Sequence, residues 1–153
     1  MNVFSRFIFL FLSCIIIYGC NTVPNELQTA EQLIETAPDS ALQILRKLNG
    51  KTIRGSYNRA LYALLMSQAL DKNELNIEND SLINIATDYF DNSDPIHAGY
   101  AFFYHARIDR NRGNLEEQAN MLFKAMEYAE KSKNNLLLGS VIYPVQPDLP
   151  FIS

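Results

Sequence analysis

Hydrophobic side chains recur every three or four positions along most of this chain, which is the period of an amphipathic helix. The pattern is clearest between Asp94 and Asn135, where Gly113 separates two helical segments. Two sets mark their apolar faces: Ala101, Tyr104, His105 and Ile108, then Leu115, Ala119, Leu122, Met126 and Ala129. Glycine readily takes the left-handed conformation that ends a helix. Asn114 and Glu117 are three residues apart, which is the spacing of a capping box at the start of the second helix. We therefore expect a helical hairpin here.

The same period predicts four earlier helices, over residues 25–36, 38–48 and 54–72 and after the caps at 79–81. Their apolar faces are Leu27, Ala30, Leu33 and Ile34; Ala41, Leu42, Leu45 and Leu48; Leu61, Tyr62, Leu64, Leu65, Met66, Gln68 and Ala69; and Leu82, Ile85, Ala86, Tyr89 and Phe90. LLLGSVIY after Asn135 predicts part of a seventh helix, and Pro144, Pro147 and Pro150 prevent its regular continuation. No segment alternates with period two, so we expect an all-α fold of antiparallel helical hairpins.

The second helices of the three hairpins are expected to begin near residues 38, 80 and 114. The last interval, 114 − 80 = 34, is the tetratricopeptide repeat (TPR) period, whereas the first, 80 − 38 = 42, is about eight residues longer, which a longer third helix and the loop after it would absorb. With Gly113 on the family's inter-helix glycine, four further residues take motif positions: Phe102, Ala106, Leu122 and Ala125. His105, Asp109 and Gln118 depart from the motif. The chain resembles a TPR protein over residues 26–132, which implies hairpins stacked as a solenoid with a concave peptide-binding groove.

The segments PDSALQILRKL, ALYALLMSQALDKNEL and DSLINIATDYF also resemble a group of bacterial TPR lipoproteins. Members of that group commonly continue through more repeats to a membrane helix and a signalling part. The resemblance therefore suggests a short or truncated member.

The N-terminal residues predict export. Arg6 precedes a run of twelve almost entirely apolar residues, 7–18, and no acid appears before Glu26. Such a run is shorter than the roughly 20 residues of a membrane-spanning helix and is typical of a signal peptide. An uncleaved signal anchor is the alternative.

Ile17-Tyr18-Gly19-Cys20 resembles the bacterial lipobox, whose cysteine takes a lipid and becomes the new N-terminus. Cys20 would be the only cysteine of the mature chain and would have no partner for a disulfide. Lipidation gives such a cysteine a role, whereas a free thiol in an exported protein would need another explanation. We thus expect a signal peptide at 1–19, a lipidated tether at 20–25, the helical domain at 26–143 and an irregular proline-rich tail at 144–153. Asn21 is not the inner-membrane retention aspartate, so the resemblance implies the outer membrane, facing the periplasm.

Candidate chemistry is sparse, and we expect no enzyme, no metal and no cofactor. His97 and His105 lie eight positions apart, about 12 Å along a helix, which is too far to share a metal. We expect His105 to be a satisfied core or boundary residue. The Glu116-Glu117 pair opens a helix, where carboxylates favour the N-terminus. A net charge of −4 argues against nucleic acid as a partner.

One stripe is a candidate partner-binding surface: Tyr100, Phe103, Arg107 and Arg110. In the TPR alignment these positions line the concave groove, where aromatic and arginine side chains suit a protein or peptide. The alternative is structural, with the aromatics packed near Tyr89 and Phe90 and the arginines paired with Asp88 or Asp109.

We therefore expect a membrane-anchored scaffold that binds a protein or peptide of the cell envelope. Two other functions are considered. One is a glycan-binding nutrient-uptake lipoprotein, which the absence of tryptophan disfavours. The other is a fragment of a TPR signalling protein.

Overall fold

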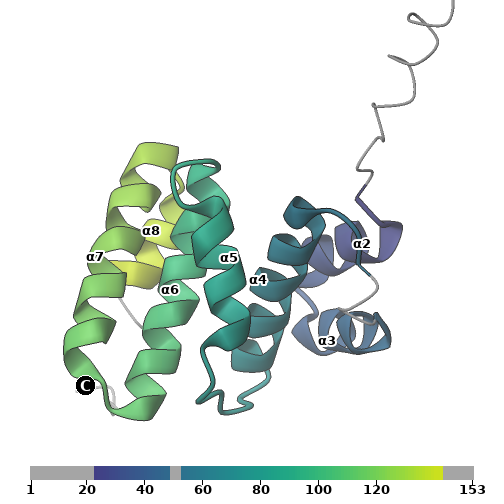
Figure 1. Ribbon diagram of the computed structural model, residues 1–153, viewed down its shortest axis with the longest axis horizontal. Helices are drawn as coiled ribbons and strands as arrows, with labels where there is room; N and C mark the ends of the chain where they lie inside the picture. Colours follow the sequence, from purple (N-terminus) through teal and green to yellow (C-terminus); the bar gives the residue numbers. More distant parts are fainter. Residues whose placement is uncertain (1–22, 49–52, 143–153) are drawn as a thin grey trace, which may run out of the picture.

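The computed structural model describes residues 23–48 and 53–142 (Figure 1). Within these ranges the chain forms seven helices and no strand: α2 (Asn25–Leu33), α3 (Pro38–Lys47), α4 (Ser56–Lys72), α5 (Ser81–Phe90), α6 (Pro95–Arg112), α7 (Leu115–Ser132) and α8 (Asn135–Ile142). The all-α prediction is confirmed, and the helices fall close to the predicted segments. The predicted signal peptide, Cys20 and the proline-rich tail lie outside the described residues.

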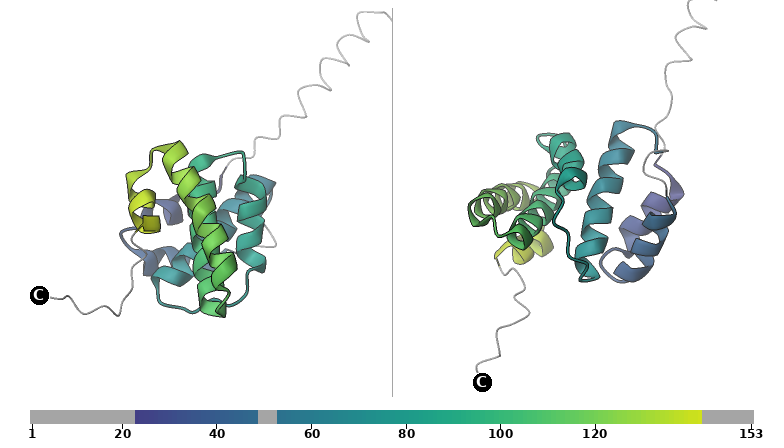
Figure 2. Two further views of the ribbon diagram at one scale, coloured as in Figure 1. Left: turned by 90° about the vertical axis from the view of Figure 1, so that its left-hand side faces the viewer. Right: turned by 60° about the horizontal axis from the view of Figure 1, so that its bottom comes forward.

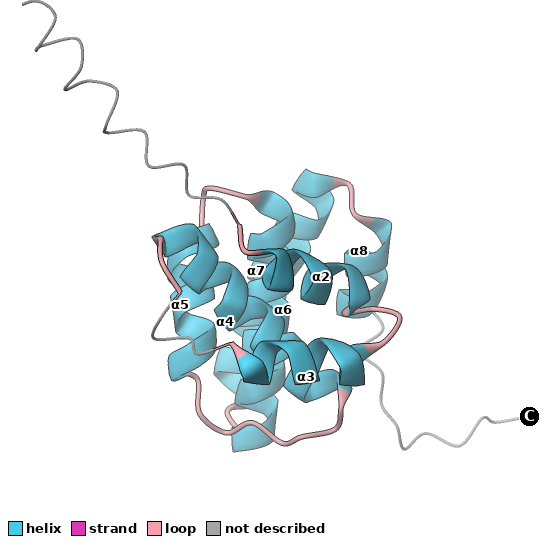
Figure 3. Ribbon diagram, turned by 90° about the vertical axis from the view of Figure 1, so that its right-hand side faces the viewer, coloured by secondary structure: helices cyan, strands magenta, loops and turns pink. Residues whose placement is uncertain are grey.

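The helices are arranged in two rows. Each packs against its neighbours in the chain, and α2, α4, α6 and α8 also contact one another in succession, so they form the first row. Helices α3, α5 and α7 form a second, looser row, in which each packs on its neighbours in the chain rather than on the other two (Figures 1 and 3). Consequently α4 and α6 have neighbours on several sides, while α7 lies at one end of the second row.

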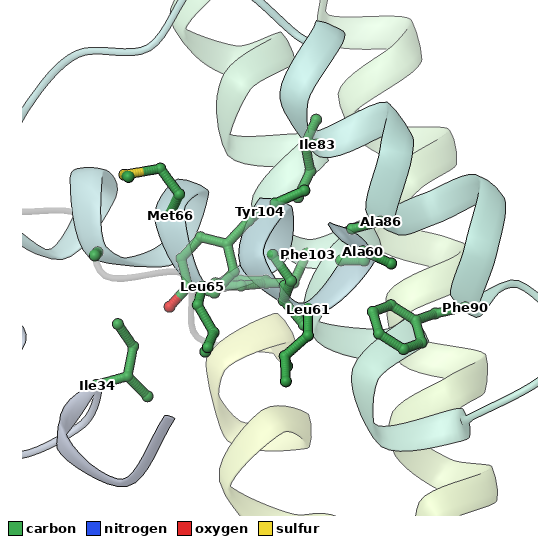
Figure 4. Packing of buried hydrophobic residues seen from close by; sticks show 14 of the residues in the cluster. Ile34, Ala60, Leu61, Leu65, Met66, Ile83, Ala86, Phe90, Phe103 and Tyr104 are labelled. Atoms are coloured by element: carbon green, nitrogen blue, oxygen red, sulfur yellow. The ribbon is translucent and has the colours of Figure 1, made fainter. Parts of the chain in front are cut away.

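The core is centred on α4. Six of its apolar residues are no more than 2% exposed: Ala60, Leu61, Ala63, Leu64, Leu65 and Ala69. Figure 4 shows Leu61 and Leu65 beside Phe103 and Tyr104 of α6, with Phe90 of α5 nearby. Fully burying a leucine contributes roughly 2 kcal/mol. This agrees with the broad apolar face that the sequence predicted for α4.

The ends of α6 follow the sequence signals. Asp94 accepts hydrogen bonds from the backbone N–H groups of Ile96 (3.1 Å) and His97 (3.2 Å). Pro95 occupies the first turn. Gly113 has a φ of 78°, the left-handed conformation expected of a helix-ending glycine.

The predicted capping box of α7 does not form. Asn114 makes no side-chain capping bond to the helix. Its backbone carbonyl instead accepts from the N–H of Gln118 (2.9 Å). Glu116 and Glu117 are both exposed in the first turn, where their charges still favour the positive end of the helix dipole.

The predicted apolar face of α5 is wrong in part. Ile83, Ala86, Thr87 and Phe90 are buried, whereas Ile85 is 45% exposed and Tyr89 is 37% exposed. Both sets have helical spacing, so the period alone cannot choose between them. Contact with α4 on one side and α6 on the other selects the face that contains Ile83.

The predicted apolar face of α7 is wrong over its first half. Leu115 is 70% exposed and Ala119 is exposed, while the buried residues are Ala125, Tyr128 and Ala129. Within the described residues α8 has eight residues against eighteen in α7, so it covers only part of that helix. Figure 2 (left) shows α8 beside only one end of α7. The other end has no covering helix among the described residues.

Candidate binding cleft between α4, α6 and α8

A cleft of about 610 Å³ opens where the C-terminal end of α4 and the loop after it approach α6 and α8. Ten residues line it: Asp71, Lys72, Glu74, Leu75, Asn76, Phe103, Tyr104, Arg107, Asn111 and Ser140. A volume of this size is within the range of ligand-binding clefts. The cleft therefore offers a mixed apolar and polar surface for a binding partner.

An ion pair joins two walls of the cleft. Arg107 of α6 donates from Nε to Oδ1 of Asp71 at 2.6 Å, and both side chains are largely buried. A hydrogen bond to a charged group is stronger than a neutral one and fixes the direction of both side chains. The pair therefore holds the end of α4 against α6.

A second polar contact joins the C-terminal part of α4 to the segment that follows α2. Glu35 accepts from Nε2 of Gln68 and from Nζ of Lys72, each at 2.9 Å. Lys72 also lines the cleft, but its ammonium pairs with Glu35 and is therefore not free to bind an anion. The apolar part of the wall is supplied by Leu75 and Phe103.

Tyr104 supplies a neutral hydroxyl to this region. Burial, together with the charges of Asp71 and Glu35, raises the pKa of Tyr104 far above its ordinary value. Arg107 and a hydrogen bond with Gln68 act in the opposite sense but do not outweigh burial. The side chain therefore stays protonated and can donate a hydrogen bond.

The structure separates the four residues of the predicted stripe. Phe103 and Arg107 line the cleft, but Phe103 is only 7% exposed. Tyr100 is half-buried and Arg110 is exposed, and neither is among the residues lining the cleft. The four side chains therefore do not share one exposed face, because α6 contacts α4, α5, α7 and α8 and has few free positions. Partner binding by these residues stays a prediction.

The alternative set of contacts is found only in part, because Phe103 is buried in the same core cluster as Phe90 but makes no ring contact with it. Tyr89 and Phe90 have Tyr57 and His97 as aromatic neighbours, and neither Tyr100 nor Phe103 is among them. Arg107 pairs with Asp71, which is 36 positions away, rather than with Asp88 or Asp109.

The sequence did not reveal the α4 side of the cleft. Asp71, Leu75 and Asn76 come from the end of α4 and the loop after it, and Ser140 comes from α8. None of these residues continues the helical spacing of Phe103 and Arg107 in α6, so that spacing could not identify them. The one available signal was the charged dipeptide Asp71-Lys72 ending an otherwise apolar helix.

The two histidines have different surroundings. His97 bonds Asp94 through Nδ1 (2.6 Å) and Glu31 through Nε2 (2.9 Å). His105 is partly buried, and its Nε2 lies 3.8 Å from Oδ2 of Asp109. Its Nδ1 has no hydrogen-bond partner, so His105 is a boundary residue whose hydrogen-bonding groups are not all satisfied. Among the described residues, no group of three or more potential ligands is placed to hold a metal.

Comparison with known proteins finds no match: no family model, no curated protein and no solved structure is similar to this chain. Over residues 23–48 and 53–142, no helix has both the length and the apolar character needed to cross a bilayer.

Proposed function

We propose that this protein is an exported, lipid-anchored scaffold built of TPR-like helical hairpins, and that it binds a protein or peptide segment in the α4–α6–α8 cleft. The observation that carries the proposal is the cleft itself, with Phe103 and Leu75 as apolar surface and Arg107 held in place by Asp71. Peptide-binding surfaces combine apolar contact area with a few oriented polar groups. Here Asn111 and Tyr104 add such groups.

The arrangement of helices is compatible with a repeat scaffold. The second helices α5 and α7 begin at Ser81 and Leu115, and 115 − 81 = 34 residues is the TPR period. The two rows of helices also suit stacked hairpins. Lipidation at Cys20 would confine the domain to the outer membrane, facing the periplasm, so that a partner there meets it at high local concentration.

Site-specific photo-crosslinking in the producing cell tests the cleft. A photoreactive phenylalanine analogue replaces Asn111 or Glu74, which are exposed cleft residues, and Ile85 on α5 provides a matched exposed position outside the cleft. We expect both cleft positions to give the same discrete protein adduct and Ile85 to give none. Identical adducts from all three positions, or none from the cleft, would rule out the cleft as the binding site.

Metabolic labelling with a fatty-acid analogue tests the anchor separately. We expect the wild-type chain to be labelled and to remain with the membranes, and Cys20→Ala to lose the label. Labelling that persists in Cys20→Ala would refute lipidation at this residue while leaving the cleft result unaffected.

A further inference from the structure

The first half of α7 carries an apolar stripe with no covering helix among the described residues. Leu115, Ala119 and Phe123 follow one another at four-residue intervals, with Leu122 and Met126 alongside, so helical geometry places all five on one face. Leu115 is 70% exposed and Phe123 is 67% exposed, the two highest values among the exposed large apolar residues. Leu122 and Met126 are half-buried. We call these five residues the α7 stripe.

One edge of the α7 stripe is acidic. Glu116, Glu127 and Glu130 are all exposed, and the helical repeat places them beside Phe123. No lysine or arginine of α7 occupies that edge.

The two lysines of α7, Lys124 and Lys131, are each engaged with an aromatic ring instead. Nζ of Lys124 lies 4.5 Å from the ring centre of Phe102 and 3.8 Å from Oδ2 of Asp91. Nζ of Lys131 lies 5.6 Å from the ring centre of Tyr128. The three carboxylates beside the stripe therefore have no lysine of α7 next to them, and both lysines are engaged at other positions around the helix.

We propose that the α7 stripe is a second docking surface, which binds an amphipathic helix carrying lysine or arginine beside its apolar face. Apolar contact with Leu115 and Phe123 would supply affinity, and the acidic edge would orient the helix and select a basic one. From Leu115 to Met126 the stripe is about 16 Å long, which matches roughly three turns of helix. None of its residues lines the α4–α6–α8 cleft, so this surface does not depend on the function proposed above.

The same charges disfavour two other occupants. Two copies of the chain packed antiparallel through this stripe would bring their acidic edges together, and like charges across an interface are unfavourable. An anionic membrane surface would likewise repel the three glutamates. A basic helix gains from the charges that penalise both alternatives.

The test uses the full chain in phosphatidylcholine nanodiscs, with empty nanodiscs as the blank. The probes are two fluorescent synthetic helices of roughly five turns with leucine at helical spacing, one filled with lysine and the other with glutamate. Fluorescence anisotropy measures binding. We expect the lysine helix to bind with an affinity that falls as salt rises, and the glutamate helix not to bind.

Substitution at exposed positions locates the surface without disturbing the core. Leu115→Ser with Phe123→Ser should weaken binding of the lysine helix at least tenfold. A matched pair, Ile85→Ser with Ile96→Ser, alters side chains that are 45% and 44% exposed elsewhere and should bind as the parent does. Glu116→Gln, Glu127→Gln and Glu130→Gln together should weaken binding and reduce its salt dependence. Far-UV circular dichroism confirms that each variant is folded.

Three results would overturn the proposal. They are equal binding of both synthetic helices, binding of the lysine helix that survives Leu115→Ser with Phe123→Ser, and binding of neither helix. Sedimentation of the full chain adds a fourth criterion: a dimer that is lost only in the Leu115→Ser and Phe123→Ser variant would assign the stripe to a second copy of the chain.

Discussion

Nε2 of His97 lies 2.9 Å from Oε1 of Glu31, which joins α6 to α2 across 66 positions of sequence. Nδ1 of the same ring bonds Oδ2 of Asp94 at 2.6 Å, and the ring stacks on Phe90 with its centre 4.8 Å away. Tyr57 of α4 meets the ring edge-on at 6.3 Å. One imidazole thus connects four helices or helix ends, and two carboxylates face its two nitrogens.

This arrangement predicts a pH-dependent stability. Burial favours the neutral imidazole, but the hydrogen bonds and charges of Glu31 and Asp94 outweigh burial and raise the pKa of His97 above its ordinary value. Because the folded pKa is the higher one, the stabilisation is fully present below the unfolded pKa and is lost as pH rises through the folded pKa. Urea unfolding should therefore show lower stability at pH 8 than at pH 6. In His97→Gln this difference should shrink. An unchanged pH dependence in that variant would contradict the assignment.

The hydroxyl of Tyr128 predicts a specific loss of stability. It donates to Oδ1 of Asp91 at 2.5 Å and accepts from the backbone N–H of Asn92 at 2.9 Å, so it ties the α5–α6 loop to α7. Tyr128→Phe keeps the stacking on Phe102, whose ring centre is 5.8 Å away, and removes only these bonds. We expect a loss of about 1–2 kcal/mol in the free energy of unfolding. Urea denaturation measures it.

Asp91→Ala, which removes the acceptor, provides the control for that prediction. If the bond between the tyrosine hydroxyl and the carboxylate is the cause, adding Tyr128→Phe to Asp91→Ala should cost less than Tyr128→Phe alone. Strictly additive losses would show that the two groups do not interact.

The two glycines at the α8 end of the molecule should respond oppositely to alanine. A Cβ on Gly99 would collide with Cδ2 of Leu137 and lie 3.3 Å from Cβ of Tyr128, whereas a Cβ on Gly139 would meet nothing within 4 Å. Alanine in a helix interior is favoured over glycine by roughly 0.5–1 kcal/mol where space allows. Gly139→Ala should therefore raise the free energy of unfolding by about that amount. Gly99→Ala should gain nothing or lose about 1 kcal/mol, because the buried side chain of Leu137 must shift and the contact between α8 and α6 is loosened.

Thermal or urea unfolding of the two alanine variants measures this difference. Limited proteolysis shows its location, since a displaced α8 should be cut faster in Gly99→Ala only. Equal stabilisation by both substitutions would mean that α8 is not packed closely on Gly99.

The sequence predicted the helices well because their signals are local. Gly113 ends α6 and Asp94 begins it, and both act within a few residues of their own position. The faces of α5 and α7 were less predictable, because α5 has two sets of residues with the helical period and because α8 covers only one end of α7. Ile83 rather than Ile85 is buried in α5 because of the positions of α4 and α6, and these positions are set by the whole fold.

The candidate site was predictable only in part for the same reason. Phe103 and Arg107 were identified, but the burial of Phe103 follows from the several helices around α6. Asp71 is 36 positions from Arg107, and no pattern in the sequence connects them. Exposure of Leu115 likewise depends on where α8 begins and ends. Local patterns therefore predict the elements, while the surface that faces a partner is determined by long-range packing.

The Arg107–Asp71 pair should be energetically coupled. Its side chains are 29% and 18% exposed, so loss of either partner leaves the other charge partly shielded from water. Arg107→Gln and Asp71→Asn should each lower the free energy of unfolding, by about 1–3 kcal/mol. The double variant should lose less than the sum of the two, with a coupling energy of about 1 kcal/mol. Urea unfolding of the wild type, the two single variants and the double variant measures this coupling energy. Arg110→Gln is the control, because it lies at an exposed position one turn further along α6, and it should leave the free energy of unfolding within about 0.5 kcal/mol of the wild type. If Arg107→Gln is as mild as Arg110→Gln, the ion pair does not hold α4 against α6, and the cleft wall depends on apolar packing by Leu75 and Phe103.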